Sequence, residues 1–135
     1  MGRLDGVIIL DTHVWLWWLS APERLSGAAA EAIERASSIG VSTLSAWEIA
    51  MLSARGRITL DREVSVWVAQ GLADARVDEL APDAQVAVTA GLLDSQTFPG
   101  DTVDCLIYAT ARSIGATLIT RDQAIRRFDP QGTIW

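Results

Sequence analysis

The chain has 135 residues, of which 50% are hydrophobic, and a net charge of −6 from 17 acidic and 11 basic residues. This length predicts one domain, residues 1–135, and an acidic domain does not attract nucleic acid by its overall charge. No apolar run approaches the roughly 18 residues of a membrane span, and the first ten residues lack the order of a signal peptide, so a soluble, cytoplasmic protein is expected.

Short β-branched runs alternate with helical patterns along the chain. Strands are expected at 7–10, around Val41, and at 77–80, 116–120 and 133–135. Helices are expected at 14–19, 26–36, 45–54, 63–72, 82–93, 101–113 and 122–128. This alternation predicts an α/β fold: a three-layer α/β/α sandwich with a central, mainly parallel sheet of four to five strands.

Carboxylates recur where these elements end or begin. Asp11 follows the first strand directly, Asp122 follows the strand at 116–120, and Asp104 lies in the first turn of the helix at 101–113. Glu48 follows the second strand and also fits a capping box in which Ser45 is the N-cap. Ligands of parallel sheets bind outside the carboxyl ends of the strands, so these acids are expected to meet in one pocket.

Each acid also has a purely structural explanation. Asp101 and Asp122 can cap the helices that follow them, and Asp104 can interact with a helix dipole. Asp11 is harder to explain in this way, because it ends a buried strand without an adjacent base. Two carboxylates at ~4 Å repel by about 4 kcal/mol at an effective dielectric of 20, so a cluster must bind protons or a cation.

The residue types favour a hard cation at such a cluster. Carboxylate oxygens are the ligands that Mg²⁺ and Mn²⁺ prefer. His13 is the single histidine, too few for a typical catalytic zinc site, and is expected to pack beside the sheet edge. Cys105 is the single cysteine, so it can form neither an internal disulfide nor a cysteine metal cluster. Paired metals on carboxylates can activate water against a phosphodiester, which predicts a nuclease.

Four sequence blocks carry the acids in order: Leu10–Leu16, Ser45–Ala50, Asp101–Asp104 and Ile119–Asp122. Together they resemble the PIN domain and, more closely, the VapC toxins of type II toxin–antitoxin systems. The resemblance runs from about Val7 to Trp135. It implies a Mg²⁺- or Mn²⁺-dependent endoribonuclease that cleaves RNA with a metal-activated water.

The resemblance also implies roles for individual residues. The acids that match the family's catalytic and metal-binding quartet are Asp11, Glu48, Asp104 and Asp122. The expected supporting residues are Asp101, Thr120 and Thr12, of which Thr120 matches a hydroxyl that can tie the site together. An Asp-Pro-x-Asp-Arg pattern found in one subgroup is broken here, since Thr102 replaces the proline and Cys105 the arginine, and Pro99 stands where that subgroup often has a histidine.

Partners follow from the same resemblance: an RNA substrate, a cognate antitoxin, and a homodimer or a toxin–antitoxin hetero-oligomer. An acidic toxin would attract a basic antitoxin peptide. Trp15, Trp17 and Trp18 either fill the core or offer one face to that partner.

Other functions remain open from the sequence. A catalytically inactive PIN-like module could bind a basic peptide with the same acids. A flap-type DNA nuclease is less favoured, because the chain lacks the helical insertions needed to thread a flap. An Asp at a strand end also resembles the site of phosphoacceptor domains, but those sites usually pair the Asp with a Lys. All 11 basic residues here are Arg, so this function is disfavoured. The pattern names neither the RNA target nor the number of bound ions.

Overall fold

The computed structural model describes residues 6–94 and 97–135, without the side chain of Asp94. Its centre is a five-stranded sheet in the order β3-β2-β1-β4-β5, in which every pair of neighbours is parallel. The strands are β1 Val7–Leu10, β2 Ser38–Ser42, β3 Val77–Leu80, β4 Thr117–Ile119 and β5 Thr133–Ile134. The predicted parallel α/β sandwich is confirmed.

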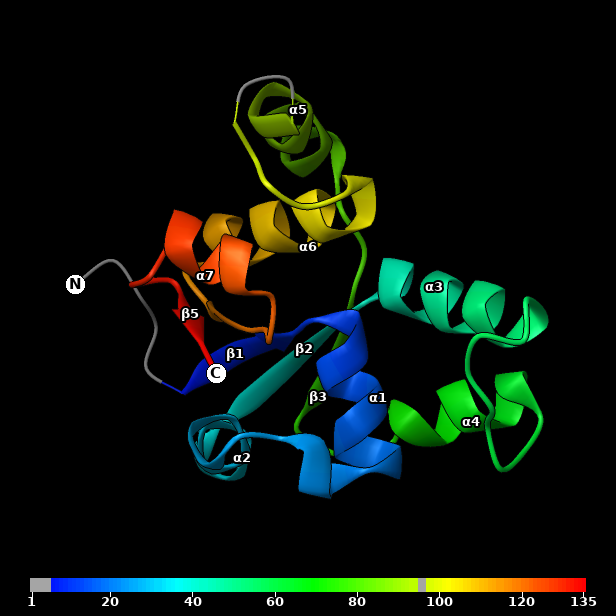
Figure 1. Cartoon of the computed structure of the whole chain (residues 1–135). Helices are drawn as coiled ribbons and strands as arrows, with labels where there is room; N and C mark the ends of the chain where they lie inside the picture. Colours follow the sequence, from blue (N-terminus) through cyan, green and yellow to red (C-terminus); the bar gives the residue numbers. More distant parts are fainter. Residues whose placement is uncertain (1–5, 95–96) are drawn as a thin grey trace.

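Helices cover both faces of this sheet (Figure 1). They are α1 Thr12–Ser20, the 3-10 helix η1 Pro22–Arg24, α2 Gly27–Arg35, α3 Thr43–Ala54, α4 Val64–Gly71, α5 Ala84–Asp94, α6 Thr102–Ser113 and α7 Gln123–Phe128. Helices α5, α6 and α7 lie on one side, and α1 and α2 lie on the other, with α3 and α4 beside α1. No described helix is long and apolar enough to cross a bilayer.

Alternation along β1 separates two cores. Ile8 and Leu10 point into one core, where they pack with Trp15 of α1 and Ile33 of α2. Ile9 points into the other core, which α5, α6 and α7 fill. Both faces of the central strand are therefore buried, as a continuous apolar run predicts for a parallel strand.

The strand order reverses at β1, and this determines where a site can form. The chain winds outward from β1 to β2 and β3, and then returns to place β4 on the other side of β1. Leu10 is paired with Ile119, and the amide of Asp11 donates to the Ile119 carbonyl at 3.0 Å. The carboxyl ends of β1 and β4 therefore lie side by side at a topological switch point, the usual ligand site of such sheets.

The tryptophans of α1 serve mainly the core. Trp15 and Trp17 are buried, and Trp18 is half-buried against the same cluster. The ring of Trp15 makes an edge-to-face contact with the ring of Trp67 in α4. The large exposed tryptophan is instead Trp47 of α3, at 57% exposure.

Candidate active site

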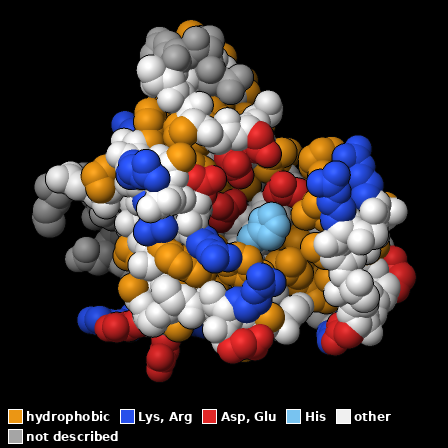
Figure 2. Space-filling view, in the orientation of Figure 1, with side chains coloured by type: hydrophobic (Ala, Val, Ile, Leu, Met, Phe, Trp, Pro, Cys, Tyr) orange, Lys and Arg blue, Asp and Glu red, His pale blue; other side chains and the backbone are white. Residues whose placement is uncertain are grey.

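One pocket of about 390 Å³ collects the predicted acids at the switch point. Figure 2 shows this region as a hollow with red acidic side chains on one side, and with the pale-blue histidine and blue arginines next to them. The pocket is lined by Asp11, Glu48, Asp101, Asp104, Asp122, His13, Val14, Trp17 and Arg121. Segments that are remote in sequence thus deliver all four quartet acids to one place.

Asp11 is the most deeply placed of these acids. It is the N-cap of α1, where its Oδ1 accepts from the Thr12 amide at 2.8 Å. Its Oδ2 accepts from the Thr120 hydroxyl at 2.7 Å. Burial raises the pKa of the Asp11 carboxyl, and the two hydrogen bonds offset part of that rise because they favour the charged form.

Thr120 links two acids through one hydroxyl. While its Oγ1 donates to Asp11, it also accepts from the Asp122 amide at 3.1 Å. Asp122 is the N-cap of α7, and its Oδ1 accepts from the Ile125 amide at 3.0 Å. Because Thr120 has no exposed surface, this bridge fixes the ends of β1 and β4 relative to each other.

Asp101 and Asp104 form a reciprocal capping box at the start of α6. The Asp104 amide donates to Asp101 Oδ1 at 2.8 Å, and the Asp101 amide donates to Asp104 Oδ2 at 3.3 Å. Gly100 approaches so closely that an added Cβ would stand 2.6 Å from the Phe98 ring and 2.8 Å from the Asp104 Cβ. The loop before α6 therefore passes too close to Phe98 and Asp104 to carry a side chain at position 100.

The acidity of the Asp104 carboxyl is also perturbed. Burial, and then the charges of Asp11, Asp101 and Glu48, raise its pKa to about 8. The ionised form is disfavoured because neighbouring negative charges are not compensated. A bound divalent cation would reverse this, since it stabilises the deprotonated carboxylate.

Glu48 reaches the pocket by a different route from the one predicted. The expected capping box is wrong: α3 begins at Thr43, and its N-cap is Ser42, whose hydroxyl accepts from the Leu44 amide at 3.1 Å. Glu48 therefore lies on the second turn of α3 rather than at a strand end. Ser45 is buried, and its Oγ lies 3.0 Å from that of Thr12, a contact that joins α3 to the start of α1.

Some pocket residues were not assigned to the site from the sequence. Trp17 and Arg121 both line the pocket, and His13, expected beside the sheet edge, is exposed within it. Arg121 had a local signal, since it directly precedes Asp122. At the broken arginine position, Cys105 is buried and its Sγ donates to the Ala90 carbonyl at 3.2 Å, so this position packs against α5.

The donor set fits a hard divalent cation. Within residues 6–94 and 97–135, no three Asp, Glu, His or Cys side chains form a ready-made metal-binding group, so the carboxylates surround the pocket rather than converge on one point. Their oxygens are nevertheless the ligands of Mg²⁺ and Mn²⁺. Burial raises the pKa values of Asp11 and Asp104, and neighbouring carboxylates raise that of Asp104 further; a bound cation would oppose both effects, because it favours the ionised carboxylates.

Comparison with known proteins places the chain in a family. The model of the PIN domain matches residues 8–130. The chain is 42% identical to Ribonuclease VapC22 of Mycobacterium tuberculosis (strain ATCC 25618 / H37Rv) over 95% of its own length and 98% of the relative.

Solved structures share the fold at lower identity. A toxin–antitoxin complex from Klebsiella pneumoniae contains a chain that is 18% identical with a TM-score of 0.68, covering 95% of this chain and 96% of that one. VapBC2 from Rickettsia felis bound to a DNA fragment from its promoter gives 15% identity and a TM-score of 0.66, covering 95% and 97%. From the family match and the close relative, this chain belongs to the PIN-domain family, in its VapC branch.

Proposed function

We propose that this chain is a metal-dependent endoribonuclease that hydrolyses phosphodiester bonds of RNA. The observation that carries the proposal is the convergence of Asp11, Glu48, Asp104 and Asp122 on one pocket in a chain 42% identical to a protein named a ribonuclease. PIN-domain ribonucleases generally depend on divalent metals, and an all-oxygen donor set favours Mg²⁺ or Mn²⁺ here.

The four quartet acids would hold the cation, directly or through water. When bound, the metal would supply an activated water and stabilise the leaving oxygen. Thr120 orients Asp11 and Asp122 through its bridging hydroxyl, and the Thr12 amide fixes the other oxygen of Asp11.

Asp101 and Asp104 contribute to the same task from α6. The Asp101 amide holds Asp104 Oδ2, which keeps the carboxyl turned to the pocket. With its pKa raised to about 8, Asp104 favours its protonated form near neutral pH, and it would give up this proton to hold a cation.

We further propose that this enzyme is the toxin of a type II toxin–antitoxin pair and acts in the cytoplasm. Support comes from the VapC relative, and from neighbours of the same fold whose structures are toxin–antitoxin complexes. A cognate antitoxin with a basic segment suits the acidic pocket, and assembly as a homodimer or toxin–antitoxin hetero-oligomer follows from the same kinship.

RNA cleavage by the purified protein tests the proposal. We expect cleavage of cellular RNA with Mn²⁺ or Mg²⁺, none in excess EDTA, and a loss of at least about a hundredfold in Asp11→Asn or Asp104→Asn. Asp61→Asn is the matched control, because Asp61 is exposed and pairs only with Arg62 among the described residues.

Two outcomes would decide against the enzyme. Equal cleavage in EDTA, or full activity of both pocket variants, would show that the carboxylates do not support the reaction. Complete absence of cleavage, together with metal-independent binding of a basic peptide, would favour the inactive interaction module.

A further inference from the structure

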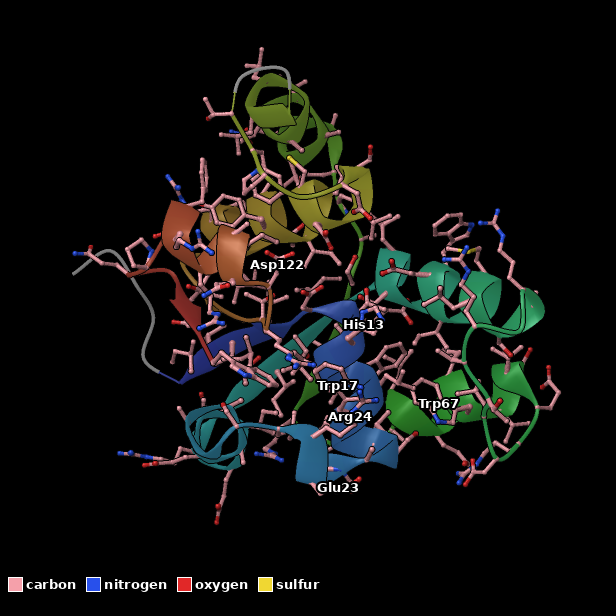
Figure 3. The ribbon with its side chains drawn as sticks, viewed as in Figure 1. His13, Trp17, Glu23, Arg24, Trp67 and Asp122 are labelled. Carbon is pink, nitrogen blue, oxygen red and sulfur yellow. The ribbon has the colours of Figure 1, made fainter. Side chains whose placement is uncertain are left out.

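Two arginines beside the acidic pocket lie over the ring of Trp17. The guanidinium carbon of Arg24 lies 4.8 Å from the centre of the Trp17 ring, and that of Arg121 lies 5.7 Å from it. Figure 3 shows His13, Trp17 and Arg24 in a row that leads away from Asp122. Both arginines come from short connecting segments, Arg24 from η1 and Arg121 from the turn between β4 and α7.

The Trp17 ring itself is fixed in place. It is only 7% exposed, and it packs against the rings of His13 and Trp135, each with centroids 5.9 Å away. A cation over an aromatic face is attracted by the ring quadrupole. Trp17 therefore gives two otherwise flexible side chains a defined position at the edge of the pocket.

These arginines do not neutralise the acids beside them. In the part of the chain that the structure describes, ion pairs with carboxylates involve Arg35, Arg62 and Arg76. The exposed guanidinium groups of Arg24 and Arg121 take part in no ion pair or hydrogen bond there. Their donors thus remain available to a ligand, although Arg121 lines the pocket together with the carboxylates and Arg24 reaches the other pocket residue Trp17.

The charge of the chain makes this placement informative. A net charge of −6 and an acidic pocket repel a polyanion. RNA carries a phosphate on each side of the bond that is cut, and these flanking phosphates need positive partners other than the cation held by the acids. Planar guanidinium groups bind phosphate with two parallel hydrogen bonds, which suits Arg better than Lys.

We propose that Arg24 and Arg121, held over Trp17, bind the RNA backbone at a phosphate next to the one that enters the acidic pocket. This inference rests on the proposed ribonuclease function and assigns its substrate-binding side. The arginines position the strand so that one phosphodiester faces the carboxylates.

Binding to a short oligouridylate measures this interaction directly, because phosphate contacts do not depend on base sequence. The protein carries Asp11→Asn, so that the strand stays intact, and Mg²⁺ is present. We compare this background with added Arg24→Gln, Arg121→Gln or both, with Arg24→Lys, and with Arg57→Gln as a control at an exposed arginine outside the pocket.

Removal of each arginine should weaken oligouridylate binding about five- to tenfold at moderate salt. The slope of log affinity against log salt should fall by about 0.7 for each arginine that no longer binds a phosphate, since single strands release counterions in that proportion. Arg24→Lys should restore the slope, and Arg57→Gln should leave it unchanged. A merely structural role would not change this slope.

Cleavage assays separate this inference from the proposed function. With Asp11 intact, the double Gln variant should show a raised KM and a nearly unchanged kcat. Suppose that the unsubstituted protein cleaves RNA, that the double Gln variant has an unchanged KM, and that the same double substitution in the Asp11→Asn protein leaves the salt slope of binding unchanged. The phosphate-binding role is then wrong, and the proposed nuclease function stands. Absence of oligouridylate binding by the Asp11→Asn protein would also overturn it.

Discussion

The bridge made by Thr120 gives the sharpest test of how the pocket is built. Thr120→Val keeps the shape of the side chain but removes the donor to Asp11 Oδ2 and the acceptor for the Asp122 amide. Because Thr120 is fully buried, water cannot easily replace the hydroxyl. Both acids lose the group that orients them, although no quartet residue has been changed.

The size of the effect follows from these two bonds. A hydrogen bond to a charged group contributes about 1.5–3 kcal/mol, which corresponds to roughly 10- to 100-fold in rate. Loss of a residue that orients a metal ligand has a similar magnitude in activity or metal affinity. The unpaired amide of Asp122 should also reduce the free energy of unfolding by about 1–2 kcal/mol.

The pH dependence distinguishes orientation from a general defect. The Thr120 bond lowers the pKa of Asp11, so its removal should raise that pKa further. The acidic limb of the kcat profile should then move to higher pH, because under the proposed function Asp11 holds the cation in its ionised form. Cleavage of RNA across a pH series, with metal titrated by calorimetry, measures both effects.

Two variants control this experiment. Thr120→Ser keeps the hydroxyl and should retain most activity. Thr117→Val makes the same exchange at the other end of β4, outside the acidic pocket, and should leave the pH profile unchanged. If Thr120→Val retains kcat within about twofold and an unshifted acidic limb, the bridge does not organise the site.

Further predictions concern other parts of the pocket. Because the pKa of Asp104 is raised from 3.8 to about 8, the stability that its proton gives the metal-free fold is complete below pH 4 and lost as pH rises to about 8. In EDTA, the free energy of unfolding of Asp104→Asn should therefore equal that of the unsubstituted protein near pH 4. Above pH 8 it should be larger by about 1–2 kcal/mol, after allowance for solvent screening, as thermal melts would show. Gly100→Ala should lower the free energy of unfolding by about 1–3 kcal/mol and reduce kcat by displacing Asp104. Gly91 has open space around it, so Gly91→Ala should instead stabilise α5 by about 0.5–1 kcal/mol. Urea unfolding measures both changes in stability. Ser45→Ala leaves the buried Thr12 hydroxyl without its partner and should lower stability by about 1–2 kcal/mol in the same assay.

The fold was predictable because strand and helix signals agree along the chain. The run at β1 is buried on both faces, as its unbroken apolar character predicts. The helix predicted at 26–36 is found as α2, which Ser26 caps through the Ala29 amide at 3.0 Å. Parallel strands then bring their carboxyl ends to one edge, so the pocket could be predicted without side-chain detail.

The start of α3 shows where local signals fail. Ser42 and Ser45 can each cap a helix, and only tertiary packing decides between them. Ser45 is needed in the buried contact with Thr12, so the helix begins earlier than predicted and caps on Ser42. The pattern of Ser45 and Glu48 matched a capping box by spacing alone, which competing tertiary contacts can override.

The meeting of the two arginines over Trp17 had no local signal. Arg24 is the last residue of η1, and Arg121 is remote from both Arg24 and Trp17 in sequence. Their approach to one indole depends on the arrangement of β4 against β1 and on the η1 turn. Sequence spacing predicts contacts within an element and, through the sheet, at strand ends, but it does not predict contacts between two connecting segments.

Capping and metal binding, treated as alternatives in the sequence, are compatible in the structure. Asp11, Asp101 and Asp122 each cap a helix through Oδ1. A carboxylate has a second oxygen, and the cap fixes the direction in which that oxygen points. Helix N-termini at the switch point therefore do two things at once: they end the loops with a satisfied backbone, and they present oriented acids to the pocket. The caps made by Asp11, Asp101 and Asp122 thus fix how these three carboxylates face the pocket.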